Sequence, residues 1–237
     1  MKFKKLAIAL AASLALSAGC NQSKKPPEET SSSKYKLLNG STSDKTDATA
    51  NTPEPALNVE TRFAAGRLAE TQGRLDCAAV QYEQALRLKS DHVPSLYRLG
   101  IVQTKMKQFD PAAATWKKYI KATGDIASGY SNLGFCYEMA GNVESAEKAY
   151  REGIQRDPKS VPCRTNYGLL LARNNRIPEA ETQLTQVLKP DEVRYNLAAV
   201  YEQKGAIAQA KAELKKAIEI NPGNKEAASR LASLPVE

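Results

Sequence analysis

The sequence predicts an all-α array of stacked helix pairs, because its marker residues recur at a fixed interval of 34 residues. Each copy holds a glycine, an alanine twelve residues later, and a large side chain four residues beyond the alanine. A period of this length is typical of helix pairs that bury their apolar faces by stacking on their neighbours. The glycines are Gly66, Gly100, Gly134 and Gly168, the alanines are Ala78, Ala112, Ala146 and Ala180, and the large residues are Tyr82, Trp116, Tyr150 and Leu184.

The first helix of each copy is expected to end at a residue that accepts the left-handed backbone conformation. Seven residues after the marker, a glycine or asparagine can stop the helix in this conformation and turn the chain. Lys107 takes this place in the second copy, where Asp110 and Pro111 instead predict a cap and a first-turn proline for the next helix. The residues at this place in the other copies are Gly73, Gly141, Asn175 and, in the fifth copy, Gly205.

These spacings resemble the tetratricopeptide repeat, a family in which each unit is a pair of antiparallel helices. The third unit matches best, with Asn132, Leu133, Gly134, Tyr137, Ala146, Tyr150 and Pro158 at the places the family prefers. The resemblance implies a right-handed superhelical solenoid of about five units followed by a C-terminal capping helix. The units are 59–92, 93–126, 127–160, 161–190 and 191–224, and the capping helix and tail are 225–237.

The fourth unit is four residues shorter than the others, which removes about one helical turn. The shortening falls near the junction with the fifth unit. We therefore expect a tight corner at Lys189 and Pro190.

The first nineteen residues predict a secretion signal. Three lysines precede an eleven-residue apolar run, Leu6 to Leu16, which is too short for a permanent membrane span. The segment ending at Cys20 resembles a bacterial lipobox, which implies that this cysteine is lipidated, and Asn21 after it implies sorting to the outer membrane. The alternative is ordinary signal cleavage near Ala18 with Cys20 left as a thiol. The expected location is the cell envelope, with the array facing the periplasm.

Residues 20–58 predict a tether between this anchor and the array. The segment is rich in Ser, Thr, Lys, Asp and Pro, and its few large apolar residues show no helical period. Such a composition cannot bury enough apolar surface to fold, so we expect disorder.

The charge pattern argues against nucleic acid as a partner. The formal net charge is +8, from 34 Lys and Arg against 26 Asp and Glu. A nucleic-acid surface requires basic residues gathered on one face with aromatic residues between them. Here bases and acids are mixed, as at Glu147, Lys148 and Arg151.

The sequence offers little material for catalysis or for a metal. Its one histidine, His92, lies in a predicted loop, and no pair of cysteines has CxxC spacing. Acids recur at place twelve of three units (Glu70, Glu138 and Glu202), where we expect a solvated or partner-contacting face. We therefore predict no enzyme activity, no cofactor and no metal. For Cys136 and Cys163 two alternatives stay open, namely a disulfide bridge or small buried residues like Cys77.

The tetratricopeptide resemblance also implies where a partner binds. In that family the first helices line an inner groove, chiefly through places two, five, nine, twelve and thirteen of each unit. A strip of aromatic and apolar side chains with charged flanks results, although Tyr97 and Tyr195 have the alternative of packing between units. The implied groove residues are Phe63, Arg67, Tyr97, Ile101, Lys105, Phe135, Glu138, Met139, Leu169, Arg173, Tyr195 and Glu202.

The expected function is a non-catalytic scaffold that binds another protein, as a peptide or helix in the groove, or a second copy of itself. The chain resembles envelope tetratricopeptide lipoproteins of the PilF and TadD types, which implies assistance in assembling a pilus or secretion complex. The alternative is an adaptor of the NlpI type, which recruits peptidoglycan enzymes. The lipid anchor would supply the contact with the membrane.

Overall fold

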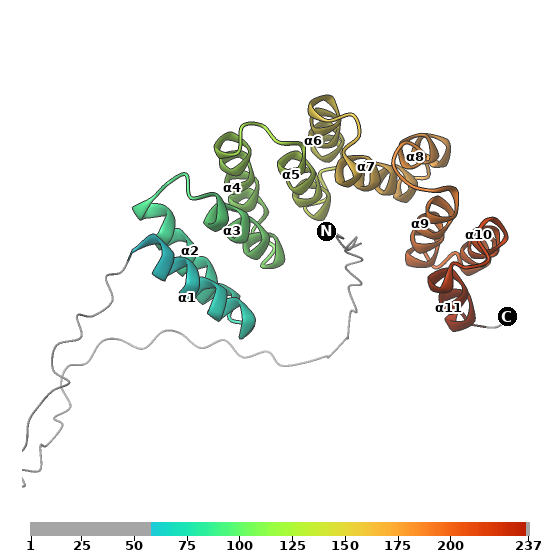
Figure 1. The fold of residues 1–237 in the computed structure, drawn as a ribbon, viewed down its shortest axis with the longest axis horizontal. Coiled ribbons are helices and arrows are strands. Elements are labelled where there is room, and N and C mark those ends of the chain that lie inside the picture. Colours follow the sequence, from blue (N-terminus) through green and yellow to red (C-terminus); the bar gives the residue numbers. More distant parts are fainter. Residues whose placement is uncertain (1–57, 236–237) are drawn as a thin grey trace, which may run out of the picture. The chain divides into compact units, whose positions relative to one another are not determined.

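The computed structural model describes residues 58–235, and every regular element in that range is an α-helix (Figure 1). The predicted signal 1–19, Cys20 and nearly all of the predicted tether lie outside the described residues. The helices are α1 (Val59–Thr71), α2 (Leu75–Leu88), α3 (Val93–Lys105), α4 (Phe109–Ala122), α5 (Ala127–Met139), α6 (Val143–Arg156), α7 (Val161–Arg173), α8 (Ile177–Leu184), α9 (Pro190–Gln203), α10 (Ile207–Ile220) and α11 (Lys225–Ser233).

Consecutive helices form hairpins, α1 with α2 through α9 with α10, and α11 packs on α10. First helices α3, α5 and α7 also pack on the second helix of the preceding pair, and α5, α7 and α9 contact one another in succession. Within this helical unit the first helices follow the inner side of a curve, and the second helices follow the outer side (Figure 1). The predicted all-α solenoid is confirmed.

The marker glycine and the large residue of each copy form a single contact between the two helices of a pair. A Cβ atom on Gly134 would lie 2.5 Å from Cε1 of Tyr150, and one on Gly100 would lie 2.6 Å from Cε2 of Trp116. Real Cβ atoms do not come so close to a ring. The aromatic ring therefore occupies the space that a side chain at the glycine would need. Because both members lie in one hairpin, this contact fixes the separation of its two helices.

The turns inside the hairpins confirm the predicted left-handed residues. Gly73, Gly141, Asn175 and Gly205 all have positive φ angles, and Lys107 adopts the same conformation with φ of 59°. The prediction that Asp110 caps the next helix is wrong, because α4 begins at Phe109 with Gln108 as its N-cap. Asp110 and Pro111 lie inside the first turn. Lys107 thus makes the same turn as the glycines.

The missing residues of the fourth unit are taken from its second helix. Helix α8 has 8 residues, whereas α6 and α10 have 14. After Leu184 the chain turns at once, and the amides of Val187 and Leu188 both donate to the Leu184 carbonyl. Helix α9 then begins at Pro190. One apolar cluster contains residues of α6, α7, α8 and α9, so the core continues through this junction.

The C-terminal end is closed by α11, where a closing helix is predicted. Ala227 of α11 is buried together with Ala217 and Leu214 of α10. Among the described residues, no helix is both long and apolar enough to traverse a bilayer.

Candidate protein-binding groove

Three of the predicted groove residues present apolar surface to solvent. Tyr97 is 37 % exposed, Phe135 38 % and Met139 50 %. They lie on α3 and α5, two neighbouring first helices on the inner side of the curve (Figure 1). Ile101 and Leu169 are half-buried and pack against the core clusters beneath them. The exposed apolar surface therefore lies on helices that pack against the core, and not on a loop.

Phe63 and Tyr97 at place five are both packed against rings of their own hairpin. The Phe63 ring lies 5.8 Å from that of Tyr82 and 5.5 Å, edge on, from that of His92. The Tyr97 ring lies 5.8 Å from Trp116 and 5.7 Å from Tyr119. Tyr97 is partly exposed, as the groove prediction requires, but its ring packs within its own pair and not between units as the alternative expected. Such contacts hold the ring in one orientation, so little entropy is lost when a partner covers it.

The side chain of the acid at place twelve of the first unit is buried, so the expectation of a solvated or partner-contacting face is wrong there. Glu70 accepts a hydrogen bond from the Tyr82 hydroxyl at 2.9 Å, and two nitrogens of Arg98 lie 2.9 and 2.5 Å from its carboxylate oxygens. Arg98 belongs to α3, in the next pair. Burial, followed by the hydrogen bond to Glu70, raises the pKa of Tyr82 to about 12.

The same arrangement recurs in the third unit with an arginine from a different place. Glu138 accepts from the Tyr150 hydroxyl at 3.1 Å and from Nη1 of Arg173, on α7, at 2.5 Å. Arg173 also donates to Gln203 of α9 at 3.1 Å. Burial, with the Glu138 charge beside it, raises the pKa of Tyr150 well above its ordinary value. Glu138 and Arg173, both predicted for the groove, are thus bonded to each other across two pairs.

At the C-terminal end Glu202 and Tyr195 contact the capping helix. Nε of Arg230, on α11, lies 2.7 Å from the Glu202 carboxylate, and its guanidinium carbon stands 5.3 Å from the centre of the Tyr195 ring. All three place-twelve carboxylates therefore pair with an arginine of a following helix. These pairs join neighbouring helix pairs and place no reactive group in the groove.

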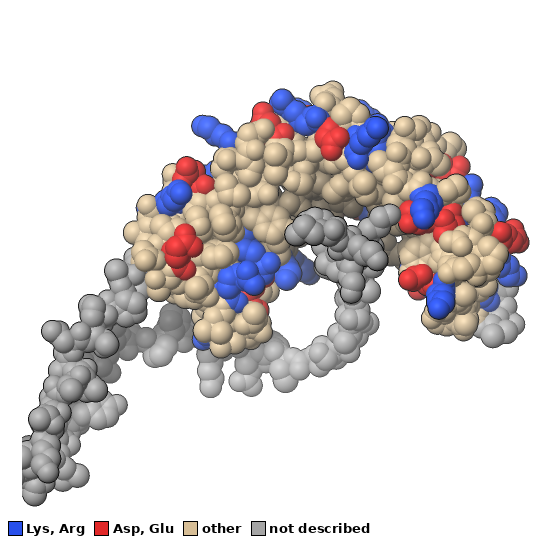
Figure 2. Space-filling view, viewed as in Figure 1, with Lys and Arg blue, Asp and Glu red and all other residues tan. Residues whose placement is uncertain are grey.

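The charges of the groove are unequal along its length. Lys105, in the last turn of α3, lies 4.0 Å from the already paired Glu70, and Arg67 on α1 is exposed. Figure 2 shows basic side chains gathered on the inner side of the N-terminal half of the array. Because the nearby carboxylate is neutralised by Arg98, this part of the groove is positively charged beside the apolar surface of Tyr97.

Cys136 and Cys163 follow the second of the two alternatives, whereas Cys77 is not fully buried. Cys136 and Cys163 are free and buried, and Cys77 is free and half-buried. The Cys136 thiol donates to the Phe109 carbonyl and the Cys163 thiol to the Ala127 carbonyl, so each is held in a different layer of the array. Burial raises the pKa of both thiols, which keeps them protonated and unreactive. Within residues 58–235, no three His, Cys, Asp or Glu side chains gather in a way that could hold a metal ion.

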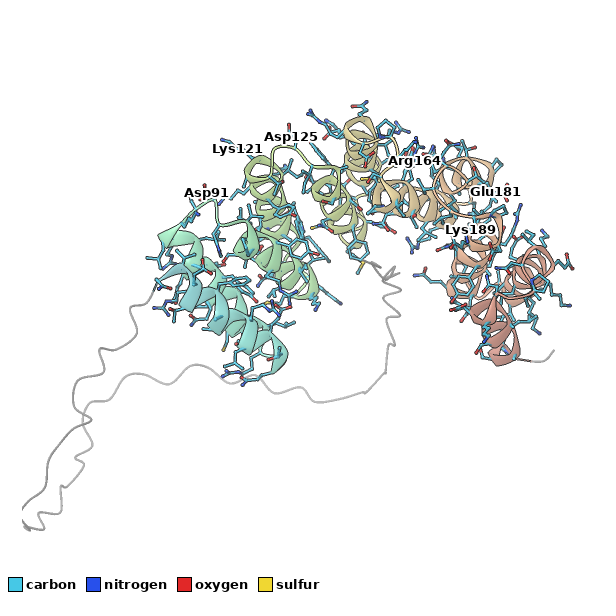
Figure 3. The ribbon with its side chains drawn as sticks, viewed as in Figure 1. Asp91, Lys121, Asp125, Arg164, Glu181 and Lys189 are labelled. Atoms are coloured by element: carbon cyan, nitrogen blue, oxygen red, sulfur yellow. The ribbon has the colours of Figure 1, made fainter. Side chains whose placement is uncertain are left out.

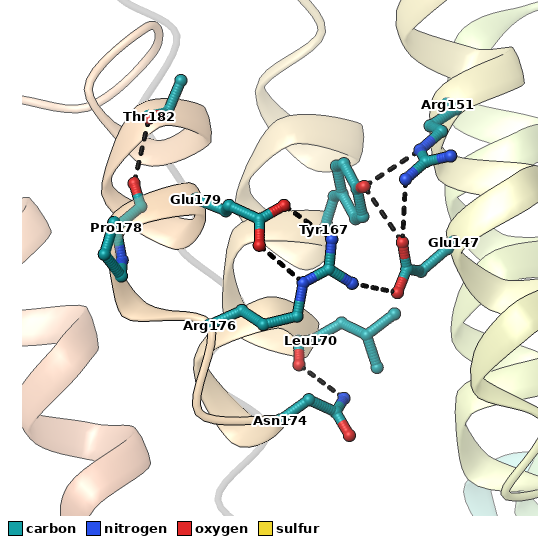
Figure 4. Close-up of polar contacts among 9 residues, drawn as sticks. All are labelled: Glu147, Arg151, Tyr167, Leu170, Asn174, Arg176, Pro178, Glu179 and Thr182. Atoms are coloured by element: carbon teal, nitrogen blue, oxygen red, sulfur yellow. Dashed lines mark hydrogen bonds and ion pairs between the residues drawn. The ribbon is translucent and has the colours of Figure 1, made fainter.

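A second polar network, on the outer side, was not anticipated from the sequence (Figure 4). Glu147 of α6 accepts from Arg151 and from the Tyr167 hydroxyl, each at 3.1 Å, and from Arg176 at 2.6 Å. Arg176 also forms two hydrogen bonds to Glu179. The spacing of four residues between Glu147 and Arg151 and of three between Arg176 and Glu179 is a visible signal for these two local pairs. The contacts of Glu147 with Tyr167 and with Arg176 cross to the next pair and depend on how the pairs stack.

Further polar contacts support the outer edge of the fourth unit (Figure 3). Arg164 of α7 donates to Gln183 of α8 at 2.7 Å, and Glu181 of α8 accepts from Arg194 of α9 at 2.5 Å. The short helix α8 is thus tied to both neighbouring first helices. These residues hold the array together and contribute nothing to the groove.

Comparisons with known proteins agree with this geometry. Sequence models of the tetratricopeptide repeat match residues 95–122, 127–160 and 191–224. The solved protein TTC0263 from Thermus thermophilus, a thermophilic tetratricopeptide protein, is 25% identical with a TM-score of 0.53, over 74% of this chain and 97% of that one. YrrB, described as a tetratricopeptide protein with an unusual peptide-binding site, is 20% identical with a TM-score of 0.50, over 74% and 93% of the two chains.

Two relatives are much longer proteins. The general transcriptional corepressor ssn6 of Schizosaccharomyces pombe is 30% identical over 138 residues, which are 57% of this chain and 12% of that protein. The general transcriptional corepressor trfA of Dictyostelium discoideum is 27% identical over 137 residues, which are 57% of this chain and 10% of that protein. The likeness covers only a small part of either relative. The repeat models and the observed fold together show that the chain carries tetratricopeptide repeats stacked in an all-helical array.

Proposed function

We propose that this protein is a non-catalytic scaffold that grips another polypeptide in the inner groove formed by its first helices. The observation that carries the proposal is the exposed apolar surface of Tyr97, Phe135 and Met139 on adjacent helices. Apolar surface of this kind on a concave face is a docking signature for peptides and helices. Tetratricopeptide proteins as a class mediate protein–protein interactions, and YrrB is described as having a peptide-binding site.

The partner segment proposed for this groove is acidic and carries apolar anchors. Arg67 and Lys105 supply positive charge on the α1 and α3 side, whereas the carboxylates of Glu70 and Glu138 are held by arginines. An acidic segment would gain both attraction during approach and a matched charge in the complex. A basic segment would meet uncompensated like charge at the same place.

The proposed location is the bacterial cell envelope, with Cys20 carrying a lipid in the outer membrane and the array facing the periplasm. Support comes from the sequence, in which a basic start, an eleven-residue apolar run and a small-residue segment end at Cys20. A scaffold held in this way would assist assembly of a pilus or secretion complex. Its anchor can be tested separately from its groove, because a Cys20→Ser variant should move from the detergent-rich to the aqueous phase while partner binding persists.

The groove is tested by crosslinking and pull-down from intact cells that carry the full chain. The test variant combines Phe135→Ala with Met139→Ala, and the matched control combines Val80→Ala with Leu88→Ala, two exposed apolar residues on α2. We expect the first variant to lose one specific partner and the control to keep it. Equal recovery of every partner with both variants would place the interface elsewhere.

A further inference from the structure

The outward face of α1 exposes apolar surface at positions that every later first helix buries. Place ten of the unit is Leu68 in α1, and this side chain is 59 % exposed. The residues at the same place in α3, α5, α7 and α9 are 0 to 2 % exposed: Val102, Cys136, Leu170 and Val200. Place seven repeats the contrast, since Ala65 is exposed while the later residues are buried: Leu99, Leu133, Tyr167 and Leu197.

Contacts inside the array show what normally covers these places. The Cys136 thiol reaches the Phe109 carbonyl of α4 at 3.5 Å, and the Tyr167 hydroxyl reaches Glu147 of α6 at 3.1 Å. Places seven and ten are therefore the surface that packs on the second helix of the preceding pair. Helix α1 presents this stacking surface with no described helix before it. Among residues 58–235, nothing covers the apolar stacking surface at this end of the array.

The opposite end of the array is finished differently. Helix α11 covers the last pair with Ala227 and presents exposed polar residues outward, including Lys225, Glu226 and Ser229. A polar outer face is what a repeat array needs at its ends to stay soluble. Residues 20–57, predicted from their composition to form a tether, lie outside the described residues, and the described part of the chain holds no helix that covers Leu68.

The sequence of α1 suits a second copy of itself as the cover. At 100° per residue, Ala64, Ala65 and Leu68 share one face of the helix. Two α1 helices that cross antiparallel between Ala64 and Ala65 place small residues at the crossing point, where the axes can approach to about 8 Å. Each Leu68 then lies beside the N-terminal half of the other helix.

The charges of α1 complement one another in the same arrangement. Glu60 and Arg67 are both exposed and lie about 20° apart around the helix axis, so they occupy the same flank of the apolar face. A two-fold axis keeps that flank on the same side in both copies, and antiparallel packing brings Glu60 within one turn of the second copy's Arg67. The two ion pairs so formed are reciprocal. In a parallel two-fold pair this flank would fall on opposite sides of the interface, so Glu60 and the second copy's Arg67 would not meet.

From these observations we infer that the outward face of α1 is the interface of a two-fold dimer of this protein. The interface is isologous, since the same residues come from each copy. A helix of thirteen residues is about 20 Å long, so the buried area falls below the standard size and the dimer exchanges readily. Arg67 is shared with the edge of the groove, whereas the exposed surface of Tyr97, Phe135 and Met139 stays free in both copies. The inference does not depend on what that surface binds.

Sedimentation velocity of the full chain over rising concentration tests the dimer directly. We expect a concentration-dependent shift from monomer to dimer, and Leu68→Glu should weaken the association at least tenfold. Under mild oxidation Ala64→Cys should give a disulfide-linked dimer, because the two copies of this residue face each other near the axis. The matched control is Ala114→Cys, an exposed alanine of α4, which should not crosslink.

Charge reversal tests the antiparallel geometry. Glu60→Arg alone and Arg67→Glu alone should each weaken the dimer, and the combined variant should restore it. Circular dichroism must show unchanged helicity in each variant, since Glu60 also lies 3.5 Å from His92. A chain that stays monomeric at all concentrations, a dimer indifferent to Leu68→Glu, or residue 64 crosslinking only to another protein would each overturn the inference.

Discussion

Tyr82 and Tyr150 occupy the place that Trp116 holds in the second pair, but the polar groups of the three rings differ in their hydrogen bonding. The two tyrosine hydroxyls donate to buried carboxylates, which arginines of later pairs neutralise. The indole Nε1 of Trp116 has no hydrogen-bond partner. Instead the Trp116 ring stands among other aromatic rings, with Tyr119 at 5.7 Å and edge on.

The difference teaches that the repeat fixes where the aromatic ring packs. It does not fix which partner, if any, hydrogen-bonds to the polar group of the ring. In all three pairs the ring lies against a marker glycine. In the first and third, place twelve is an acid and a charged link to the next pair results. In the second, place twelve is Thr104, and aromatic packing replaces the link. The second pair is also where Tyr97 presents its ring to the groove.

The largest expected effect comes from breaking a charged link. Arg173→Ala leaves Glu138 mostly buried without its cation, which should lower the free energy of unfolding by about 3 kcal/mol. Urea unfolding followed by circular dichroism measures the change. Adding Glu138→Gln to Arg173→Ala should recover a good part of the loss, because no buried charge is then left. The exposed Arg87→Ala of α2 should change stability by less than about 0.5 kcal/mol.

Alkaline unfolding should reveal the part of the stability that depends on the Tyr82 hydroxyl. The pKa of Tyr82 is raised to about 12 in the folded chain, against an ordinary value of 10. The folded state therefore holds this proton more tightly, so its stabilisation is complete below pH 10 and is lost as the pH rises toward 12. The loss should be roughly 2 kcal/mol. Urea unfolding at pH 9 and pH 11.5 should show a smaller difference in Tyr82→Phe than in the native chain.

Replacing the marker glycine with alanine should lower the free energy of unfolding more where the neighbouring ring is held by a hydrogen bond. Gly134→Ala would press on Tyr150, whose hydroxyl is fixed by Glu138, and should cost about 2 kcal/mol through overpacking. Gly100→Ala would press on Trp116, which has no polar anchor and can shift, so the cost should be smaller. Thermal and urea unfolding of the two variants give the order. A larger loss in Gly100→Ala would contradict the anchoring argument.

The smallest expected effect is removal of one hydroxyl. Tyr150→Phe keeps the ring on Gly134 but deprives Glu138 of one donor, which should cost about 1 kcal/mol. The Arg173 contact remains, so the carboxylate is still neutralised. Unfolding of Tyr150→Phe, Arg173→Ala and the combined variant gives the coupling between the two donors. Strict additivity would show that hydroxyl and guanidinium act on Glu138 independently.

The predictable part of the site was its place on the first helices. Tyr97, Phe135 and Met139 could be assigned to the inner side because the tetratricopeptide resemblance implies that their places in the repeat line the groove. The pairing of Glu138 with Arg173 could not be predicted from the sequence. Arg173 lies 35 residues after Glu138, whereas Arg98, which pairs with the equivalent Glu70, lies 28 residues after it. The two links share an acid place and a ring, but the arginines come from different places. No single spacing reveals both.

By itself the sequence determined the helix pairs and the turns between their helices. All of these depend on residues close together within one repeat, where chain geometry leaves few alternatives. Only the tertiary structure decided which repeated positions are buried. Leu68 is exposed and Val102 is buried at the same place of the pattern, because burial depends on whether another helix pair stands in front of that place. Stacking also brought Glu70, Glu138 and Glu202 to their arginines, since the low dielectric between packed helices favours a carboxylate only when a cation completes it.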